Sequence, residues 1–364
     1  MDNPHLENGP LQAVQLRAQF AKVHQELFRS LRPLLLGHPC PFVRPACGIL
    51  TNGPQKGKWQ KGPWFGPWGR NARILLRPGP LGMLSQVGNQ GAESIGAAPI
   101  GVFDSGLGGL TVVREIAAAM PAESIVYLGD SARVPYGIKS LETVRKFAIE
   151  DARFLLGFGP KLIVAACNTA SAAAIDSLES LCPVDVVDVI RPGASEALAR
   201  AAGTIAVIGT EATISSGAYE RAIAAIDPQR EVRSVACPLL VPIVEEGRDK
   251  DDPIVLHVLS DYLRDLQRLR PGALILGCTH YPLLTDAIAK LMGPEVIIVD
   301  SARATARRVR DLLAQKQQAG TGTGGLRCFP TDNPRRFAEL GPRFAGRAID
   351  SVQYVATDEM EAYH

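Results

Sequence analysis

Short apolar runs alternate with longer segments of helical periodicity from residue 99 onward. Each run is followed by a polar or glycine-rich turn. Near-continuous apolar runs are typical of parallel strands that are covered by helices on both faces. The pattern therefore predicts an α/β fold with mostly parallel sheets flanked by helices. The predicted strands are 100–103, 124–129, 162–167, 184–189, 204–209, 230–237, 273–278 and 295–300.

A weak internal repeat divides this part of the chain. The run LIVAAC ends at Cys167, and the similar run ALILGC ends at Cys278, about 110 residues later. Ligands of open parallel sheets bind at the carboxyl ends of the strands. We therefore predict two similar lobes, 99–190 plus 300–364 and 191–299, with the two cysteines facing each other across the cleft and the active site between them.

Residues 1–98 lack this alternation of strand and helix. Only 11–36 shows the apolar spacing of an amphipathic helix, and 48–80 is crowded with glycine and proline. We interpret 1–98 as a poorly structured extension, either an appendage or an over-extended start with Met83 as the true first residue. A regulatory role is also open.

Three tryptophans in the extension suggest an alternative role for it. Trp59, Trp64 and Trp68 lie among lysines and arginines, and aromatic rings interleaved with cations can bind a partner or nucleic acid. The extension acting as a binding module is therefore kept as an alternative function.

The composition is that of a soluble globular protein, with 46% hydrophobic and 21% charged residues in 364. The net charge of +2 conceals an asymmetry. Residues 1–98 hold 11 Lys and Arg against 4 Asp and Glu, a net of +7, whereas 99–364 hold 28 against 33, a net of −5. Such a body gives no reason to expect a membrane or nucleic acid as its main partner. The start, MDNPHLENGP, does not resemble a secretory signal, which predicts a cytoplasmic location.

The seven cysteines form an odd set without a C-x-x-C pair, so free thiols are expected rather than disulfides or a zinc ribbon. Cys167 and Cys278 each end an apolar run and precede a predicted helix start, where the helix dipole favours a thiolate. The remaining cysteines lack this setting and are predicted to be structural; they are Cys40, Cys47, Cys182, Cys237 and Cys328.

Two thiols suit the inversion of a stereocentre by proton transfer. That reaction needs a base on one face of Cα and an acid on the other, with the roles exchanged in reverse. Asp104, at the end of one run, and His280, two residues beyond Cys278, are candidates to accept a thiol proton or to orient a thiolate. We expect Asp104 beside Cys167 and His280 beside Cys278.

The turn Asp104–Gly109 is rich in glycine, and its backbone N–H groups suit a carboxylate. It has neither the lysine of a phosphate-binding loop nor the spacing of a dinucleotide motif. Asp130 and Glu245 are candidates to contact an ammonium group or to tune the site. Cys278-Thr279-His280 is too compact for common zinc spacings, so we predict no metal and no cofactor. Further neutral groups for a small zwitterion are Tyr136, Gly137, Asn168, Thr169 and Thr279.

Five segments resemble the aspartate/glutamate racemase family, and glutamate racemase in particular. They occur in family order and with family-like spacing, and the resemblance covers about residues 99–364. Two departures are the extension and Arg191, where an acidic or neutral residue is expected near the hinge. The segments are IGVFDSGLGGLTV (100–112), YLGDSARVPYG (127–137), ACNTASAAA (166–174), PLLVPIVEEG (238–247) and LGCTHYPLL (276–284).

The resemblance implies a specific function. It implies interconversion of L- and D-glutamate without cofactor or metal, by Cys167 and Cys278, which supplies D-glutamate for peptidoglycan. It also implies two α/β lobes with the active site between them, and a cell-wall precursor as activator of some members. An activator and a homodimer stay open here, as does aspartate as an alternative substrate. Substrate binding is implied for Asp104, Ser105, Tyr136, Gly137, Asn168, Thr169, Thr279 and His280, with Asp104, Glu245 and His280 assisting catalysis.

Overall fold

The computed structural model describes residues 98–361, which lie within one compact unit, Asn71–His364. The expected helix at 11–36, the three tryptophans and Met83 lie outside the described residues. Within 98–361, no helix is both long and apolar enough to cross a membrane.

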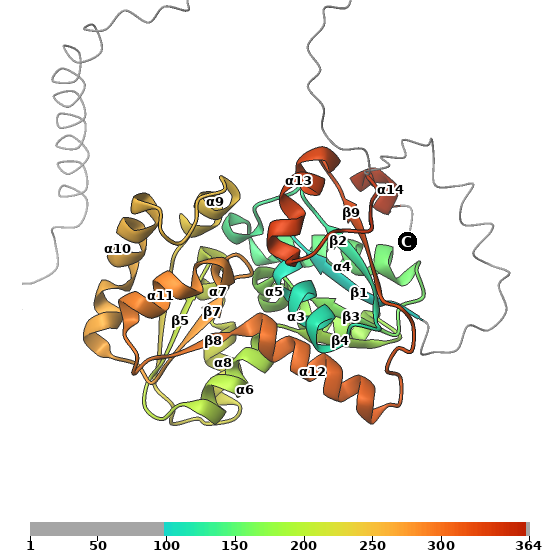
Figure 1. Ribbon diagram of the computed structural model, residues 1–364. Helices are drawn as coiled ribbons and strands as arrows, with labels where there is room; N and C mark the ends of the chain where they lie inside the picture. The colour runs from blue at the N-terminus through green and yellow to red at the C-terminus, as the bar shows by residue number, and fades with distance from the viewer. Residues whose placement is uncertain (1–97, 362–364) are drawn as a thin grey trace, which may run out of the picture. The chain divides into compact units, whose positions relative to one another are not determined.

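The first sheet has six parallel strands in the order β10-β9-β2-β1-β3-β4 (Figure 1). Its carboxyl-terminal strands come from the end of the chain, so residues far apart in sequence complete one sheet. The strands are β1 (Ile100–Asp104), β2 (Ser124–Gly129), β3 (Leu162–Ala165), β4 (Asp185–Asp188), β9 (Gly325–Pro330) and β10 (Ser351–Val352).

Helices cover both faces of the first sheet because side chains on a strand alternate between its faces. Val102 joins an apolar cluster with α3, α12 and α13, whereas its neighbour Phe103 joins another with α4, α5 and α14. The helices are α3 (Leu110–Ala119), α4 (Leu141–Leu156), α5 (Asn168–Leu181), α12 (Ser301–Gln315), α13 (Pro334–Ala345) and α14 (Thr357–Glu361), and a short 3₁₀ turn, η3 (Tyr136–Ile138), precedes α4.

The second sheet has four parallel strands in the order β6-β5-β7-β8. Val207 packs towards α6 and α8, and Ile208 packs towards α9, α10 and α11. The elements are α6 (Ile190–Arg200), β5 (Ile205–Gly209), α7 (Glu211–Ser215), α8 (Ala218–Ala224), β6 (Val232–Ala236), α9 (Leu240–Glu245), α10 (Pro253–Leu269), β7 (Ala273–Gly277), η4 (Tyr281–Leu284), α11 (Thr285–Met292) and β8 (Ile297–Asp300).

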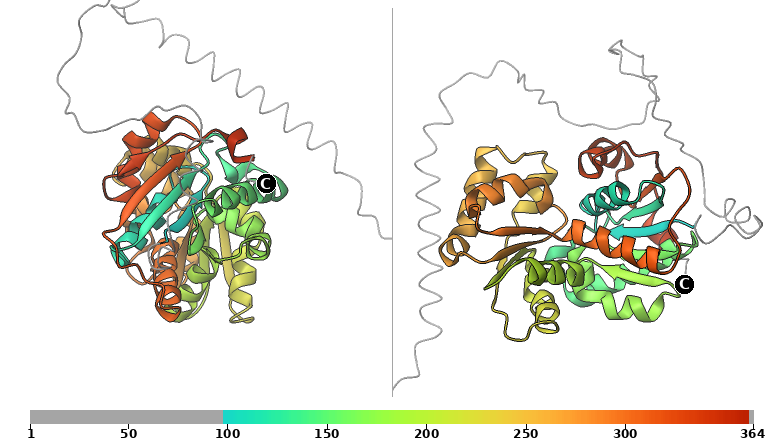
Figure 2. Two further views of the ribbon diagram at one scale, coloured as in Figure 1. Left: turned by 90° about the vertical axis from the view of Figure 1, so that its right-hand side faces the viewer. Right: turned by 60° about the horizontal axis from the view of Figure 1, so that its bottom comes forward.

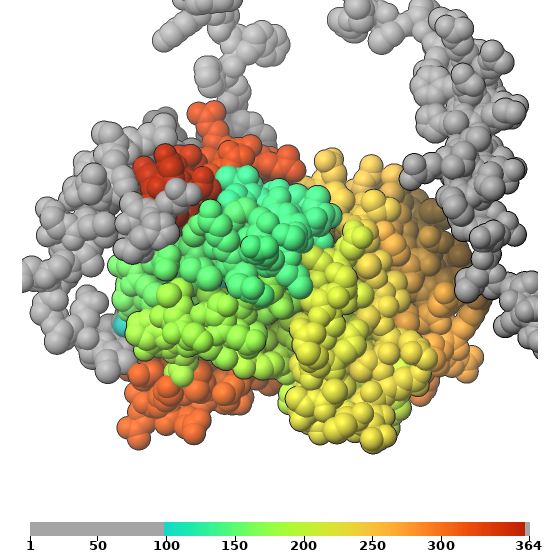
Figure 3. All heavy atoms as spheres, turned by 180° about the vertical axis from the view of Figure 1, so that it is seen from behind, coloured from blue at the N-terminus to red at the C-terminus, as the bar shows by residue number. Residues whose placement is uncertain are grey.

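Two helices, α6 and α12, carry the chain between the sheets and pack against each other (Figure 2). Their contact is close at Gly193, where an added Cβ would lie 2.8 Å from Oγ of Ser301. On the face shown in Figure 3, green residues from the half with the first sheet border directly on yellow residues from the half with the second. The two sheets are therefore connected by two adjacent helices, α6 and α12.

The predicted α/β fold with two parallel sheets flanked by helices is confirmed, and all eight predicted strands form. Strands β9 and β10 were not predicted. The expectation of a helix start directly after Cys278 is wrong, because η4 intervenes and α11 begins only at Thr285. Pro282 lies within η4, where its missing N–H removes no α-helical hydrogen bond.

Candidate active site

Cys167 is the N-cap residue of α5. It comes two positions after the end of β3, and the residue between them, Ala166, is buried. Only 5% of the residue is exposed, and its Sγ lies 3.8 Å from Oγ of Ser105. Burial and the charge of Asp104 raise the pKa of the Cys167 thiol to about 12. The helix start was predicted to favour a thiolate here, but in this conformation burial and the charge of Asp104 act in the opposite direction and have the larger effect.

Cys278 follows the last residue of β7 and is 6% exposed. Its Sγ lies 3.8 Å from Nδ1 of His280, and Nε2 of the same ring lies 3.0 Å from Oε1 of Glu245. Burial lowers the pKa of His280, but its hydrogen bonds with Cys278 and Glu245 and their charges outweigh that effect and raise the pKa to about 10. The ring therefore lies between the sulfur of Cys278 and the carboxylate of Glu245, and both neighbours favour its protonated form.

Glu245 is the last residue of α9. With Cys278 and His280 it forms a row of three side chains in contact. Burial raises its pKa, but the hydrogen bond to His280 and the charge of His280 give a net lowering. Helix α13 reaches the same place, since Phe344 packs edge-on against the imidazole with ring centroids 5.6 Å apart and Arg336 donates to the carbonyl oxygen of Glu245. The carboxyl-terminal part of the chain thus encloses the row.

Asp104 ends β1 and is fully buried. Its Oδ2 accepts from the backbone N–H of Gly106 at 2.9 Å, and its Oδ1 accepts from Oγ1 of Thr279 at 3.4 Å. Burial raises its pKa, although the charge of His280 opposes the effect. Asp104 was predicted beside Cys167, on which its charge acts, but its side chain also contacts Thr279, the residue after Cys278.

The glycine-rich turn after Asp104 allows a close approach. A Cβ added to Gly108 would lie 2.2 Å from Oγ1 of Thr279 and 2.6 Å from the ring of His280. The hydroxyl of Thr111 also donates to the carbonyl oxygen of Thr279 at 2.9 Å. The turn thus packs directly on the segment that follows Cys278, and its glycine serves backbone proximity.

Three threonine hydroxyls form a second polar contact between the halves. Oγ1 of Thr169 lies 3.0 Å from that of Thr210 and 3.1 Å from that of Thr213. Gly137 approaches the same group, because a Cβ there would lie 2.6 Å from Cβ of Thr210. Sequence reasoning missed Thr210 and Thr213, although Thr210 directly follows β5 and a strand end was a usable signal.

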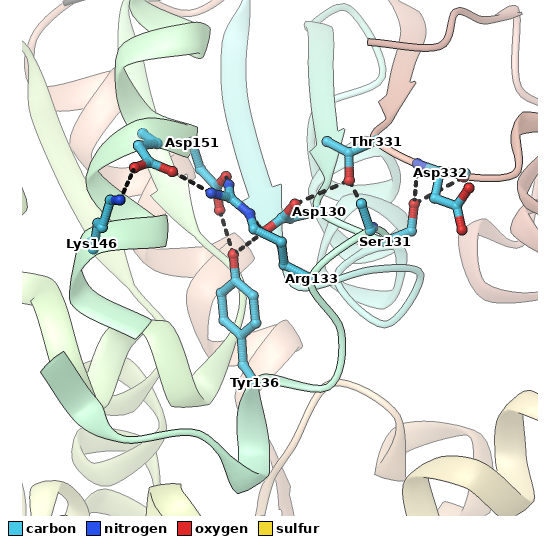
Figure 4. Close-up of polar contacts among 10 residues, drawn as sticks. Asp130, Ser131, Arg133, Tyr136, Lys146, Asp151, Thr331 and Asp332 are labelled. Atoms are coloured by element: carbon cyan, nitrogen blue, oxygen red, sulfur yellow. Dashed lines mark hydrogen bonds and ion pairs between the residues drawn. The ribbon is translucent and has the colours of Figure 1, made fainter. Parts of the chain in front are cut away.

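The Tyr136 hydroxyl points into an ionic cluster that contains Asp130, Arg133 and Asp151 (Figure 4). It hydrogen-bonds to Asp130 and, at 3.1 Å, to Oδ2 of Asp151. Arg133 pairs with both carboxylates, at 2.6 and 3.1 Å, and Thr331 donates to Asp130 at 3.0 Å. The interpretation of Asp130 as a contact for an ammonium group is therefore wrong, since its oxygens are occupied by these partners.

Arg191 lies away from the two cysteines. Its guanidinium pairs with Asp188 and, at 2.5 Å, with Glu179. It lines a cavity of about 1110 Å³ between β4, α6 and α12 that neither Cys167 nor Cys278 borders. The arginine thus has local acidic partners at the crossing between the sheets.

The remaining described cysteines are free, and two of them are fully buried core residues. Cys237 and Cys328 have no exposed surface and join the same apolar cluster, whereas Cys182 is half-buried. Burial, with the charge of Cys278 adding to it, raises the pKa of Cys237 to about 12. Cys40 and Cys47 lie outside the described residues. Across 98–361, no group of three metal-binding side chains is arranged around an ion site.

Comparisons with known proteins agree with this arrangement. Residues 100–309 match the family model Asp/Glu/Hydantoin racemase. The glutamate racemase of Syntrophus aciditrophicus is 46% identical over 260 residues, which are 71% of this chain and 96% of that protein.

Solved structures give the same result. Glutamate racemase isoform RacE1 from Bacillus anthracis is 41% identical, with a TM-score of 0.69 over 71% of this chain and 97% of that one. Glutamate racemase from Francisella tularensis in complex with D-glutamate is 39% identical, with a TM-score of 0.68 over 72% and 99%. The resemblance to glutamate racemase found in the motifs is confirmed.

Proposed function

Because this chain belongs to the Asp/Glu/Hydantoin racemase family, we propose that it interconverts L- and D-glutamate by proton transfer between Cα and two thiols. The observation that carries the proposal is the setting of Cys167 and Cys278. Each follows a parallel strand and each is buried. Asp104, at the end of the strand β1 that pairs with β3 ahead of Cys167, accepts a hydrogen bond from Thr279, the residue after Cys278. The glutamate racemases at 39–46% identity support glutamate as the substrate.

The two cysteines differ in their surroundings. We place the attacking thiolate at Cys278, since Nδ1 of His280 lies 3.8 Å from its Sγ and the ring can hold the thiol proton, whereas burial and the charge of Asp104 raise the pKa of Cys167 to about 12, so that Cys167 keeps its proton. The thiolate takes the proton from Cα as the C–H electron pair moves onto the carbon. The opposite thiol then gives its proton to the other face, and reversal exchanges the two roles.

The remaining predicted residues would hold the substrate between the thiols. We assign this role to the carboxylate of Asp104 and to neutral groups on both halves. Because both protons reside on side chains, the reaction needs no cofactor. The substrate-binding set is Asp104, Ser105, Tyr136, Gly137, Asn168, Thr169, Thr279 and His280; Tyr136 would contribute through its backbone, since its hydroxyl is engaged elsewhere.

We propose that the halves move as two lobes, 99–190 with 300–364 and 191–299. The burial of both cysteines supports this, because glutamate can reach them only if the halves separate. Thiol chemistry requires a reducing compartment, which supports the cytoplasm. D-Glutamate made there would serve peptidoglycan synthesis.

The test is a coupled assay of D-glutamate formed from L-glutamate with no added cofactor, in parallel with aspartate. It is run on the full chain and on a chain lacking residues 1–82, each with and without a cell-wall precursor. No turnover of glutamate by the wild-type protein contradicts the assignment, and faster turnover of aspartate changes the substrate.

Replacing the thiols tests the two-base step. Cys167→Ala and Cys278→Ala should each lower kcat/KM by about 10³-fold or more, since a positioned acid or base contributes about 10²–10⁴-fold. Cys237→Ala is the matched control, because that buried thiol lies outside the proposed site. In D₂O, early product should carry deuterium at Cα while the remaining substrate keeps protium. An equal loss in Cys237→Ala would reject the site.

A further inference from the structure

A buried chain of hydrogen bonds connects the two strand ends that carry the cysteines. Nδ2 of Asn168, the residue after Cys167, donates to the Tyr219 hydroxyl at 2.8 Å. That hydroxyl lies 3.1 Å from Oγ of Ser301, which donates to the carbonyl oxygen of Leu276 at 3.1 Å. Leu276 precedes Cys278 by two residues, so the chain runs from one cysteine segment to the other.

Every member of this chain is shielded from water. Asn168, Tyr219, Ser301 and Leu276 are between 1% and 4% exposed. Burial raises the pKa of Tyr219 well above its ordinary value, so the phenol keeps its proton. A buried polar group without a hydrogen-bond partner destabilises the protein. Breaking any one of these hydrogen bonds is therefore unfavourable.

The carbonyl at the far end sets the direction of the whole chain. A carbonyl oxygen can only accept, so Ser301 donates its single hydroxyl hydrogen to Leu276 and must accept from Tyr219. The single hydroxyl hydrogen of Tyr219 is therefore donated to Ser301, and Tyr219 must accept from Asn168. Only the amide nitrogen of Asn168 can donate, so that nitrogen faces Tyr219 and the amide oxygen is left for another partner.

We propose that Tyr219 and Ser301 are positioning residues that fix the amide of Asn168, so that its oxygen faces the ammonium group of the bound amino acid. This inference rests on the proposed function, in which Asn168 binds the substrate. Neither residue touches the reacting atoms. They act by preventing the amide from turning over, which would bring its N–H groups against a cation.

Ser301 places this series of hydrogen bonds at the two helices, α6 and α12, that connect the halves. Ser301 opens α12, one of the two connections, and packs against Gly193 in α6, the other. The ring of Tyr219 packs over Gly277, where an added Cβ would lie 3.0 Å from Cε2. The amide orientation is therefore set only when Asn168 and Ser301, both on the lobe with the first sheet, meet Tyr219 of α8 on the other lobe.

The two hydroxyls can be removed separately, with different consequences. In Tyr219→Phe the amide loses its acceptor and is free to adopt either orientation. In Ser301→Ala the Tyr219 hydrogen is released and can be donated to Asn168, which turns the amide oxygen towards Tyr219 and the N–H groups towards the ammonium. Ser301→Ala should therefore be the more damaging change.

The experiment measures KM and kcat for glutamate and the inhibition constant of glutarate, the same dicarboxylate without an ammonium group. We expect Ser301→Ala to raise KM about 10- to 100-fold, as for a lost hydrogen bond to a charged group, and Tyr219→Phe to raise it less. The double variant should resemble Tyr219→Phe, since no hydroxyl then forces the wrong orientation. Glutarate inhibition should stay within about twofold of wild type in all three.

Ser180→Ala and Tyr354→Phe are matched controls, since both side chains are exposed. Thermal melting checks folding of each variant. Unchanged KM in both single variants, or glutarate inhibition that weakens in step with KM, would overturn the inference, as would a double variant worse than Ser301→Ala. Wild-type turnover of glutamate is measured in the same series, so its absence would reject the proposed function and not this inference alone.

Discussion

Gly108 lies where the turn after Asp104 meets Thr279 and His280. In Gly108→Ala the new Cβ would lie 2.2 Å from Oγ1 of Thr279 and 2.6 Å from the imidazole, whereas ordinary contacts begin at 3.4 Å. The Thr279 hydroxyl must therefore retreat by about 1.2 Å. The ring cannot easily make room, because Glu245 and Cys278 hold its two nitrogens.

This displacement should act on activity more than on folding. A misplacement of about 1 Å in a catalytic group can cost about 100-fold, so kcat/KM for glutamate should fall by about that factor. Overpacking of this kind costs about 1–3 kcal/mol, which leaves the chain folded at 25 °C. The assay pairs racemization kinetics with the free energy of unfolding in urea.

Gly106→Ala, in the same turn, is the control for inserting alanine. Its Cβ would meet only a methyl group of Val134, at 3.7 Å, and its backbone N–H would still donate to Asp104. We expect kcat/KM within about threefold of wild type, because no overlap has to be relieved. A Gly108→Ala enzyme with wild-type kcat/KM would refute the reasoning, since the halves would then tolerate separation at this contact.

Two further predictions concern the charged residues. Glu245→Gln should lower the pKa of His280 from about 10, which moves the alkaline limb of kcat/KM to lower pH. The protonated ring stabilises the fold fully below pH 6.5, the pKa of histidine in the unfolded chain, and this stabilisation is lost as the pH rises to about 10, the pKa in the folded protein. The accompanying fall in the free energy of unfolding should be smaller in the variant. An unchanged pH profile would contradict the pairing of Glu245 with His280. Arg133→Met should destabilise the protein by about 3–5 kcal/mol in urea unfolding, because Asp130 and Asp151 are left buried without their cation. The deficit should diminish in acid, where Asp151, whose pKa burial raises, binds a proton, and a deficit independent of pH would argue against this cause.

The strands of the two sheets could be predicted because burial on both faces makes their sequences continuously apolar. Strand β9 escaped prediction because Gly325–Pro330 carries Arg327 and ends in proline, and it follows a stretch of glycine and threonine. Its pairing with β2, about 200 residues earlier in the chain, leaves no local signal. Strand β10 is too short, at two residues, to show an alternation.

Candidate site residues could be selected from the sequence where a chemically useful side chain coincides with a strand end. Cys167 and Asp104 could be selected in this way. The hydroxyls of Tyr219 and Ser301 could not, because tyrosine in an amphipathic helix and serine at a helix start have ordinary structural explanations. Their role depends on contacts between segments 51 and 82 residues apart in the chain.

The placement of β9 has a consequence for biosynthesis. The second sheet is built from a continuous stretch, residues 205–300, whereas the first needs β9 beside β2. During translation, β2 therefore emerges early but must wait for residues 325–330 with its edge unpaired. An apolar strand edge is a template for association with other chains. The nascent chain thus still carries an unpaired edge on β2 when the residues of its second sheet have all been made.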